Sequence, residues 1–145
     1  MPMPAFTLDD QHDVPVTIAA ETRVIIFARD MDGADIVEEA LSQDGAALLA
    51  GAGALFVSDI HRMPGLITRM FALPSMRKRP YRMVLDREGK LTADLPAQEE
   101  KVSLIRLNQF KIENVEYIGD AAQLRAALQA AAKPAAGQPS GETGK

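Results

Sequence analysis

Residues 24–59 read VIIFARDMDGADIVEEALSQDGAALLAGAGALFVSD, and this stretch decides the fold. The unbroken apolar run near its start predicts a strand at residues 23–27 that is covered on both faces. A second run predicts a similar strand at 54–58. Between them, apolar residues recur at helical spacing, which predicts a helix over 34–50 that Asp32 or Asp35 caps and Gly51 or Gly53 ends. This order indicates two parallel strands joined by a helical crossover.

The rest of the chain adds short elements around this unit. We expect a helix at about residues 64–71 and a closing helix that begins at Asp120. Further strands are predicted at 81–85, 91–95, 102–107 and 112–117, with a turn at residues 86–89 between the first two. The pattern predicts an α/β protein whose central mixed sheet lies between helices.

Chain length and composition indicate one domain. A chain of 145 residues that is 47% hydrophobic can close a single core. We assign residues 1–132 to this domain. Residues 133–145, KPAAGQPSGETGK, contain no large apolar side chain to offset the entropy lost on ordering, so we expect a disordered tail.

The composition excludes several kinds of chemistry. The chain has no cysteine, which excludes disulfides, thiolate metal sites and iron–sulfur ligation, and its two histidines are too few for a histidine-rich metal site. A net charge of −4 and the lack of tryptophan argue against nucleic-acid binding. No apolar run approaches the ~20 residues that span a bilayer. We therefore expect a soluble protein, either cytoplasmic or, if a leader was removed, periplasmic.

Three phrases of the sequence resemble the thioredoxin-like superfamily, and especially its peroxiredoxin branch, the alkyl hydroperoxide reductase and thiol-specific antioxidant family. FTLDDQH at residues 6–12 resembles the opening F-x-L-x-D-Q-x-G of that branch, followed by its V-x-L strand at 14–18. VIIFARD at 24–30 resembles the strand that leads to the peroxidatic loop. YRMVLDREGKL at 81–91 resembles the hairpin R-x-x-F-V-I-D-x-x-G-x-I, with Arg82 near the active-site arginine of the family. The resemblance implies a thioredoxin-like three-layer α/β/α fold.

The sequence departs from this family at the reactive position. The family has a nucleophilic cysteine at the start of the helix after the first central strand, where the helix dipole and an arginine lower its pKa. Here the equivalent position is Ala34 or Asp35, and neither can attack a peroxide. We therefore predict that thiol peroxidase and disulfide oxidoreductase activities are absent.

Three features are candidates for a site. Pro80, in Arg79-Pro80-Tyr81, stands where thioredoxins have a cis-proline, and it is either such a residue or a trans proline that ends a loop. His61 follows a predicted strand, where it is either an acid–base group with Asp59 or polar surface. Half of the sixteen basic residues fall between Arg62 and Lys90, whereas the charged residues among the first 44 are mainly acidic. The two groups either steer an anionic ligand or complement each other within the fold.

The leading hypothesis is a non-catalytic thioredoxin-like module that binds a protein partner or a small anionic ligand. The predicted surface comprises Arg29, Asp30, Asp32, Asp35, His61, Arg79, Pro80 and Arg82. This hypothesis requires no cofactor. One alternative is an oxidoreductase with a bound flavin, for which Arg29, Asp59, His61 and Arg82 are the polar set. The other is a structural subunit that uses the apolar segment 63–76 as its interface.

Overall fold

The computed structural model describes residues 7–18, 22–61, 70, 73–79, 81–93, 95–109 and 111–132. The helix predicted at 64–71, with the exception of Met70, and the tail predicted at 133–145 lie outside the described residues. The cis-proline expectation for Pro80 lies outside them as well.

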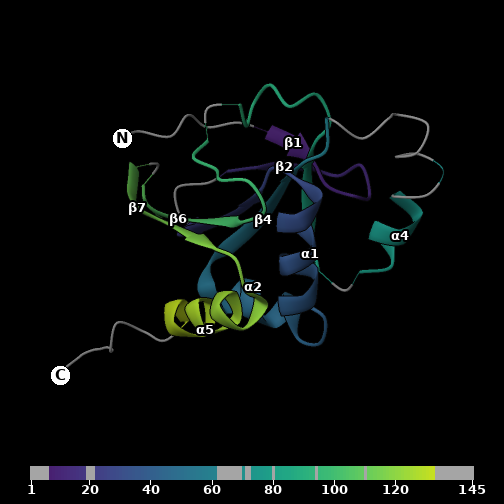
Figure 1. The fold of residues 1–145 in the computed structure, drawn as a ribbon. Helices are drawn as coiled ribbons and strands as arrows, with labels where there is room; N and C mark the ends of the chain where they lie inside the picture. Colours follow the sequence, from purple (N-terminus) through teal and green to yellow (C-terminus); the bar gives the residue numbers. More distant parts are fainter. Residues whose placement is uncertain are drawn as a thin grey trace.

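A five-stranded mixed sheet forms the centre of the molecule (Figure 1). β3 (Val24–Ala28), β4 (Ala54–Asp59) and β5 (Met83–Asp86) are parallel to one another. β6 (Val102–Asn108) and β7 (Lys111–Ile118) form an antiparallel hairpin, and β6 pairs antiparallel with β3. The strand order is β5-β4-β3-β6-β7, which puts β3 at the centre. The predicted mixed sheet and the central position of the VIIFA strand are confirmed.

The hairpin predicted at residues 81–91 is wrong. β5 pairs in parallel with β4, which lies between β5 and β3, so the VIIFARD and YRMVLD segments share a sheet without being neighbours. Residues 91–93 and 95, the described part of the second predicted strand, are not in a strand. The Asp86 carboxylate accepts hydrogen bonds from the backbone of Gly89 and from both the backbone and the hydroxyl of Thr92, and these bonds fold the segment into turns. The hairpin beside β3 is instead made by β6 and β7.

The single helix predicted at 34–50 is two helices, α1 (Met31–Ala40) and α2 (Gly45–Ala52). Asp30, rather than Asp32 or Asp35, caps α1 by accepting a hydrogen bond from the backbone of Gly33. Asp44 stands before α2 without capping it, because its carboxylate binds Arg125 instead. Of the two glycines considered as a helix end, Gly53 ends α2 in the left-handed conformation, whereas Gly51 lies within the helix. α4 (Leu73–Arg77) and α5 (Ala121–Ala132) complete the described helices.

The sheet separates two apolar clusters. On one face, β3 contributes Val24 and Ile26 to a cluster that α1, α2 and α5 cover. Figure 1 shows α2 and α5 stacked against each other, with α1 crossing near them. On the other face, Ile25 and Phe27 pack with Val16 of the hairpin formed by β1 (Thr7–Asp9) and β2 (Pro15–Thr17). On the first face, α1 lies over β3 and β6, and α2 packs against β4. α4 borders the β4–β5 side, where its Ser75 and Met76 line a cavity together with Phe56 of β4.

Candidate functional site

The basic and acidic segments of the chain pair with each other. Arg77 and Arg87 lie 3.3 and 3.0 Å from the carboxylate of Asp13, and Arg82 lies 3.4 Å from that of the buried Asp10. These ion pairs join the loop between β1 and β2 to the β5 edge of the sheet. At these positions the opposite charges of the two segments pair within the fold. Arg82 is one of the paired residues.

Arg29 also binds within the protein. Its Nη2 donates to the carbonyl oxygens of Thr92, Ala93 and Leu95 at 2.7, 3.2 and 3.2 Å. Its guanidinium lies 5.1 Å from the centre of the Phe27 ring, at cation–π distance. Arg29 thus holds the loop after β5 against the end of β3.

The structure brings His61 and Asp59 together at the end of β4. His61 Nδ1 lies 2.6 Å from Asp59 Oδ1, and the Asp59 side chain is buried whereas that of His61 is 40% exposed. A Cβ atom at Gly89 would lie 2.5 Å from His61 Nδ1, so the left-handed Gly89 allows the loop after β5 to pack on the ring. The carboxylate orients the imidazole, and an acid–base role for this pair stays a prediction.

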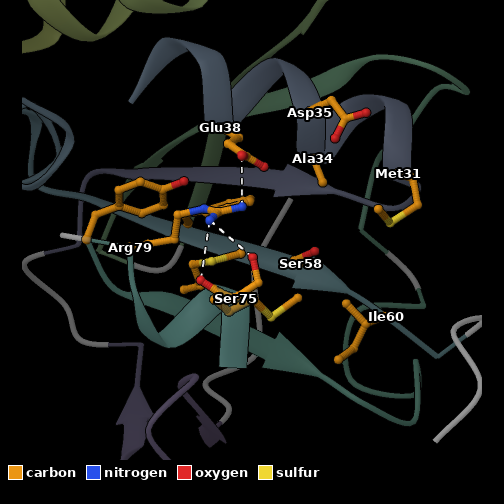
Figure 2. Close-up of a pocket in the computed structure, with 12 residues that line it drawn as sticks. Met31, Ala34, Asp35, Glu38, Ser58, Ile60, Ser75 and Arg79 are labelled. Carbon is orange, nitrogen blue, oxygen red and sulfur yellow. Dashed lines mark hydrogen bonds and ion pairs between the residues drawn. The ribbon is translucent and has the colours of Figure 1, made fainter. Parts of the chain in front are cut away.

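A cavity of about 150 Å³ opens between α1 and α4, over the face of β4 (Figure 2). Most of its wall is apolar. Its lining comprises Met31, Ala34, Asp35 and Glu38 of α1, Phe56, Ser58 and Ile60 at β4, and Ser75, Met76, Arg79, Tyr81 and Met83 at α4 and β5. We call this set the α1–α4 groove.

A second cavity, of about 270 Å³, continues the α1–α4 groove toward the start of α1. It shares Met31, Ala34, Ser58 and Ile60 with the first cavity, and it adds Arg29, Asp30 and Asp59. The combined hollow therefore reaches from the α4 side of the sheet to the N-terminus of the helix that follows the central strand.

Arg79 crosses the first cavity between the two helices. Its Nη2 lies 2.8 Å from Glu38 Oε1 on α1, and its Nη1 donates to the carbonyl and the hydroxyl of Ser75 on α4 at 3.3 and 3.4 Å. Figure 2 shows Glu38 and Ser75 on opposite sides of the guanidinium. Arg79 thus joins the two walls of the groove.

Tyr81 lies beside Arg79 and is 4% exposed. Burial raises the pKa of its phenol above the usual value of 10.0, and Arg79 opposes part of that rise, both by its charge and by lying close to the phenol oxygen as a hydrogen-bond donor. The hydroxyl of Tyr81 therefore keeps its proton at neutral pH.

The predicted surface is gathered only in part. Asp35 and Arg79 line the first cavity, Arg29 and Asp30 line the second, and His61 contacts the second through Asp59. Arg82 lines a separate hollow with Ala46 and Leu49, so the four residues considered for a flavin do not share one cavity. Asp32 is exposed in the first turn of α1.

Sequence reasoning missed the polar centre of the groove. Tyr81 and Glu38 were not candidates, and the methionines at 31, 76 and 83 come from three separate elements. One signal was available: Tyr81 is one of only two tyrosines in the chain and begins an apolar strand segment, where its hydroxyl needs a partner.

The strand order and the helix that directly follows the central strand define a thioredoxin-like α/β fold. Several solved structures share it. Peroxidoxin BcpB from Mycobacterium tuberculosis matches with a TM-score of 0.58 at 17% identity, over 92% of this chain and 94% of that chain. A thio-disulfide isomerase from Thermus thermophilus matches with a TM-score of 0.56 at 21% identity, over 90% of this chain and 94% of that chain.

StoA from Bacillus subtilis matches with a TM-score of 0.55 at 15% identity, over 87% of this chain and 96% of that chain. No protein-family model matches the sequence, and no curated protein matches it either. At these identities the likeness is one of fold. The chain thus has a thioredoxin-like fold, and it contains no cysteine.

Within the described part of the chain, no group of three or more His, Asp or Glu side chains is arranged to hold a metal ion. No helix there is long and apolar enough to cross a lipid bilayer.

Proposed function

We propose that this chain is a thioredoxin-like binding module that works without thiol redox chemistry and receives its ligand in the α1–α4 groove. The observation that supports this proposal is the position of the groove. Its second cavity begins at Asp30 and Met31, at the start of the helix after the central strand, where the family that the sequence resembles has its reactive cysteine. In this chain the same region offers a mainly apolar hollow that suits binding.

The charges of the groove favour some ligands over others. Arg29, Arg77 and Arg82 are engaged with other groups of the protein, and Asp35 and Glu38 add negative charge to the groove wall. We therefore favour a segment of a protein partner or an uncharged small molecule over a small anion. The rim carries Met31, whose exposed, flexible thioether suits an apolar contact.

The absence of thiol chemistry has a direct test. The purified chain should neither consume hydrogen peroxide in the presence of dithiothreitol nor accelerate the reduction of insulin disulfides. Catalysis of either reaction above the rate without protein would contradict this half of the proposal.

The binding half is tested by filling the groove. Ala34 lines both cavities, so Ala34→Phe should block them, whereas Ala126→Phe adds the same ring at an exposed position of α5. We expect fragments found by saturation-transfer NMR to bind the wild type and Ala126→Phe but to lose binding to Ala34→Phe.

Ser75→Phe on α4 fills the groove from the other wall and serves where Ala34→Phe does not fold. The absence of fragment binding to the wild type, or its retention in a folded groove-filling variant, would overturn the proposal.

We also propose that the chain belongs near the peroxiredoxin branch. The D-Q pair of the opening phrase supports this, because Asp10 and Gln11 are both buried and join the N-terminal hairpin to β5. The phrase at 81–91 gives no support, since β5 is an edge strand. Sequences of intermediate relatives provide the test: the proposal expects some that keep the D-Q phrase and have a cysteine near the start of α1. Intermediates with a C-x-x-C pair there instead would contradict it.

A further inference from the structure

Two buried polar atoms at the α1–α4 groove have no hydrogen-bond partner within the described part of the chain. They are Arg79 Nε and the Tyr81 hydroxyl oxygen, and both residues line the first cavity. Leaving such groups unpaired in the interior destabilises a protein, so each buried unpaired group requires an explanation.

The rest of the Arg79 side chain is held in place. Its two terminal nitrogens contact Glu38 and Ser75 from opposite sides, as Figure 2 shows. The guanidinium therefore cannot turn to satisfy Nε without losing those contacts. Nε carries one hydrogen and can only donate.

Tyr81 offers the second donor. Because burial keeps the phenol protonated, its hydroxyl hydrogen is present at neutral pH. A small shift that brought Arg79 Nε to the phenol oxygen would satisfy Nε, yet it would leave the hydroxyl hydrogen without an acceptor. An acceptor placed between the two side chains would pair with both donors.

The size, wall and charge of the cavity restrict the molecule that carries this acceptor. A volume of about 150 Å³ is that of an apolar cavity known to hold benzene. Phe56, Met76 and Met83 supply apolar wall. The groove wall carries two exposed carboxylates, Asp35 and Glu38, against the single positive charge of Arg79, and this excess of negative charge disfavours an anion.

We propose that the first cavity binds an uncharged, apolar molecule of single-ring size through a carbonyl-type oxygen that accepts hydrogen bonds from the Tyr81 hydroxyl and Arg79 Nε. This proposal rests on the proposed function, since it names the class of ligand for the same groove. It assigns Tyr81 as the residue that selects for the acceptor oxygen.

Three probes of similar size separate the contributions. Acetophenone carries the carbonyl oxygen, ethylbenzene lacks it, and benzoate carries a negative charge. Dissociation constants are measured from the shifts of backbone amide signals as each probe is added to the full chain at neutral pH. We expect acetophenone to bind about three- to tenfold more tightly than ethylbenzene, the usual gain from a neutral hydrogen bond, and more tightly than benzoate.

Variants locate the hydrogen bond. Tyr81→Phe should remove most of the preference for acetophenone while leaving ethylbenzene binding within twofold. Tyr117→Phe changes the other tyrosine, on β7, and should leave the preference intact. Arg79→Lys keeps a positive charge beside Glu38 without Nε and should also weaken the preference.

Three outcomes overturn the inference. One is equal affinity for acetophenone and ethylbenzene, another is an unchanged preference in folded Tyr81→Phe, and the third is tighter binding of benzoate than of acetophenone. If no probe binds, the inference also fails. Binding of ethylbenzene with no preference for the carbonyl would refute this inference alone, because the proposed function requires only that the groove be the binding site.

Discussion

Gln11 shows how a single buried side chain positions one wall of the groove. It is 1% exposed, and its amide donates to the carbonyl oxygen of Tyr81 at 2.8 Å and accepts from the backbone nitrogen of Met83 at 2.8 Å. The side chain pairs with the chain on both sides of Arg82, as a neighbouring strand would. The Q of the opening phrase is therefore a structural residue that fixes Tyr81 and Met83 in the groove.

Replacing Gln11 with alanine should lower the free energy of unfolding by about 3 kcal/mol, because it leaves two buried backbone groups without partners. Urea unfolding followed by circular dichroism measures this change. Gln43→Ala, at an exposed turn position, is the control and should change stability by less than ~0.5 kcal/mol. A loss below ~1 kcal/mol for Gln11→Ala would show that the amide does not support the β5 edge.

Removing the Tyr81 hydroxyl should have the opposite effect on stability from removing the Gln11 amide. Without ligand, Tyr81→Phe removes a buried hydroxyl that has no partner, so the variant should be as stable as the wild type or up to about 2 kcal/mol more stable. Thermal unfolding of the ligand-free chain provides the measurement. A fall in stability of more than ~1 kcal/mol would mean that the hydroxyl already has a partner within the protein.

Among the elements, α1 depends on the residue before it. Asp30 accepts hydrogen bonds from Gly33 and Glu100 at 2.8 Å each, so it caps the helix and ties the loop before β6 to it. Asp30→Ala should cost about 1–2 kcal/mol of stability by urea unfolding. Asp32→Ala removes an exposed carboxylate in the first turn and should cost less than ~0.7 kcal/mol. Equal effects of the two substitutions would rule out capping by Asp30.

α5 is attached to the other helices by an ion pair that responds to pH. The Asp44 carboxylate receives two hydrogen bonds from Arg125, at 2.6 and 2.8 Å, which lower its pKa below the usual 3.8. Arg125 also donates to the carbonyl oxygen of Ala40, so it connects α5 with the end of α1.

Because the folded-state pKa of Asp44 is depressed, its contribution to stability is present above the ordinary aspartate pKa and is lost as the pH falls through the folded-state value. The difference in unfolding free energy between the wild type and Asp44→Asn should be constant from neutral pH to about pH 5 and should shrink below the ordinary value of 3.8. Carboxyl NMR titration reports the pKa directly. A pKa at or above 3.8 in the folded chain would contradict this account.

At the scale of the whole molecule, the local sequence pattern predicted the helices and strands better than it predicted which strands pair with each other. The strands β3 and β4 could be predicted because a strand buried on both faces needs an unbroken apolar run. The end of α2 could be narrowed to Gly51 or Gly53 because a left-handed helix end favours glycine. The placement of β5 could not be predicted. Its apolar run suits a parallel edge strand as well as a hairpin strand. The hydrogen bonds from Gly89 and Thr92 to Asp86 span only three and six residues, yet residue types alone do not reveal that they form in place of a second strand.

The site was predicted even less completely, because its contacts join residues that are far apart in the sequence. Arg29 and Arg82 looked available in the sequence, yet carbonyl groups 63 to 66 residues away bind the first and Asp10 binds the second. Conversely, three methionines from three separate elements line the groove, and their spacing in the sequence does not indicate that they lie close together. Among the described residues of the predicted surface, only Asp35 and Arg79 line the first cavity.

The central claim is that the α1–α4 groove is a ligand site, and methyl NMR of the full chain tests it most directly. With methionine and leucine methyl groups labelled, addition of acetophenone should shift the signals of Met31, Met76 and Met83 along saturable curves with one dissociation constant. The signals of Leu124 and Leu128, which α5 contributes to the core, should stay in place. Methionine signals that do not move, or that move no more than the leucine signals, would contradict the account.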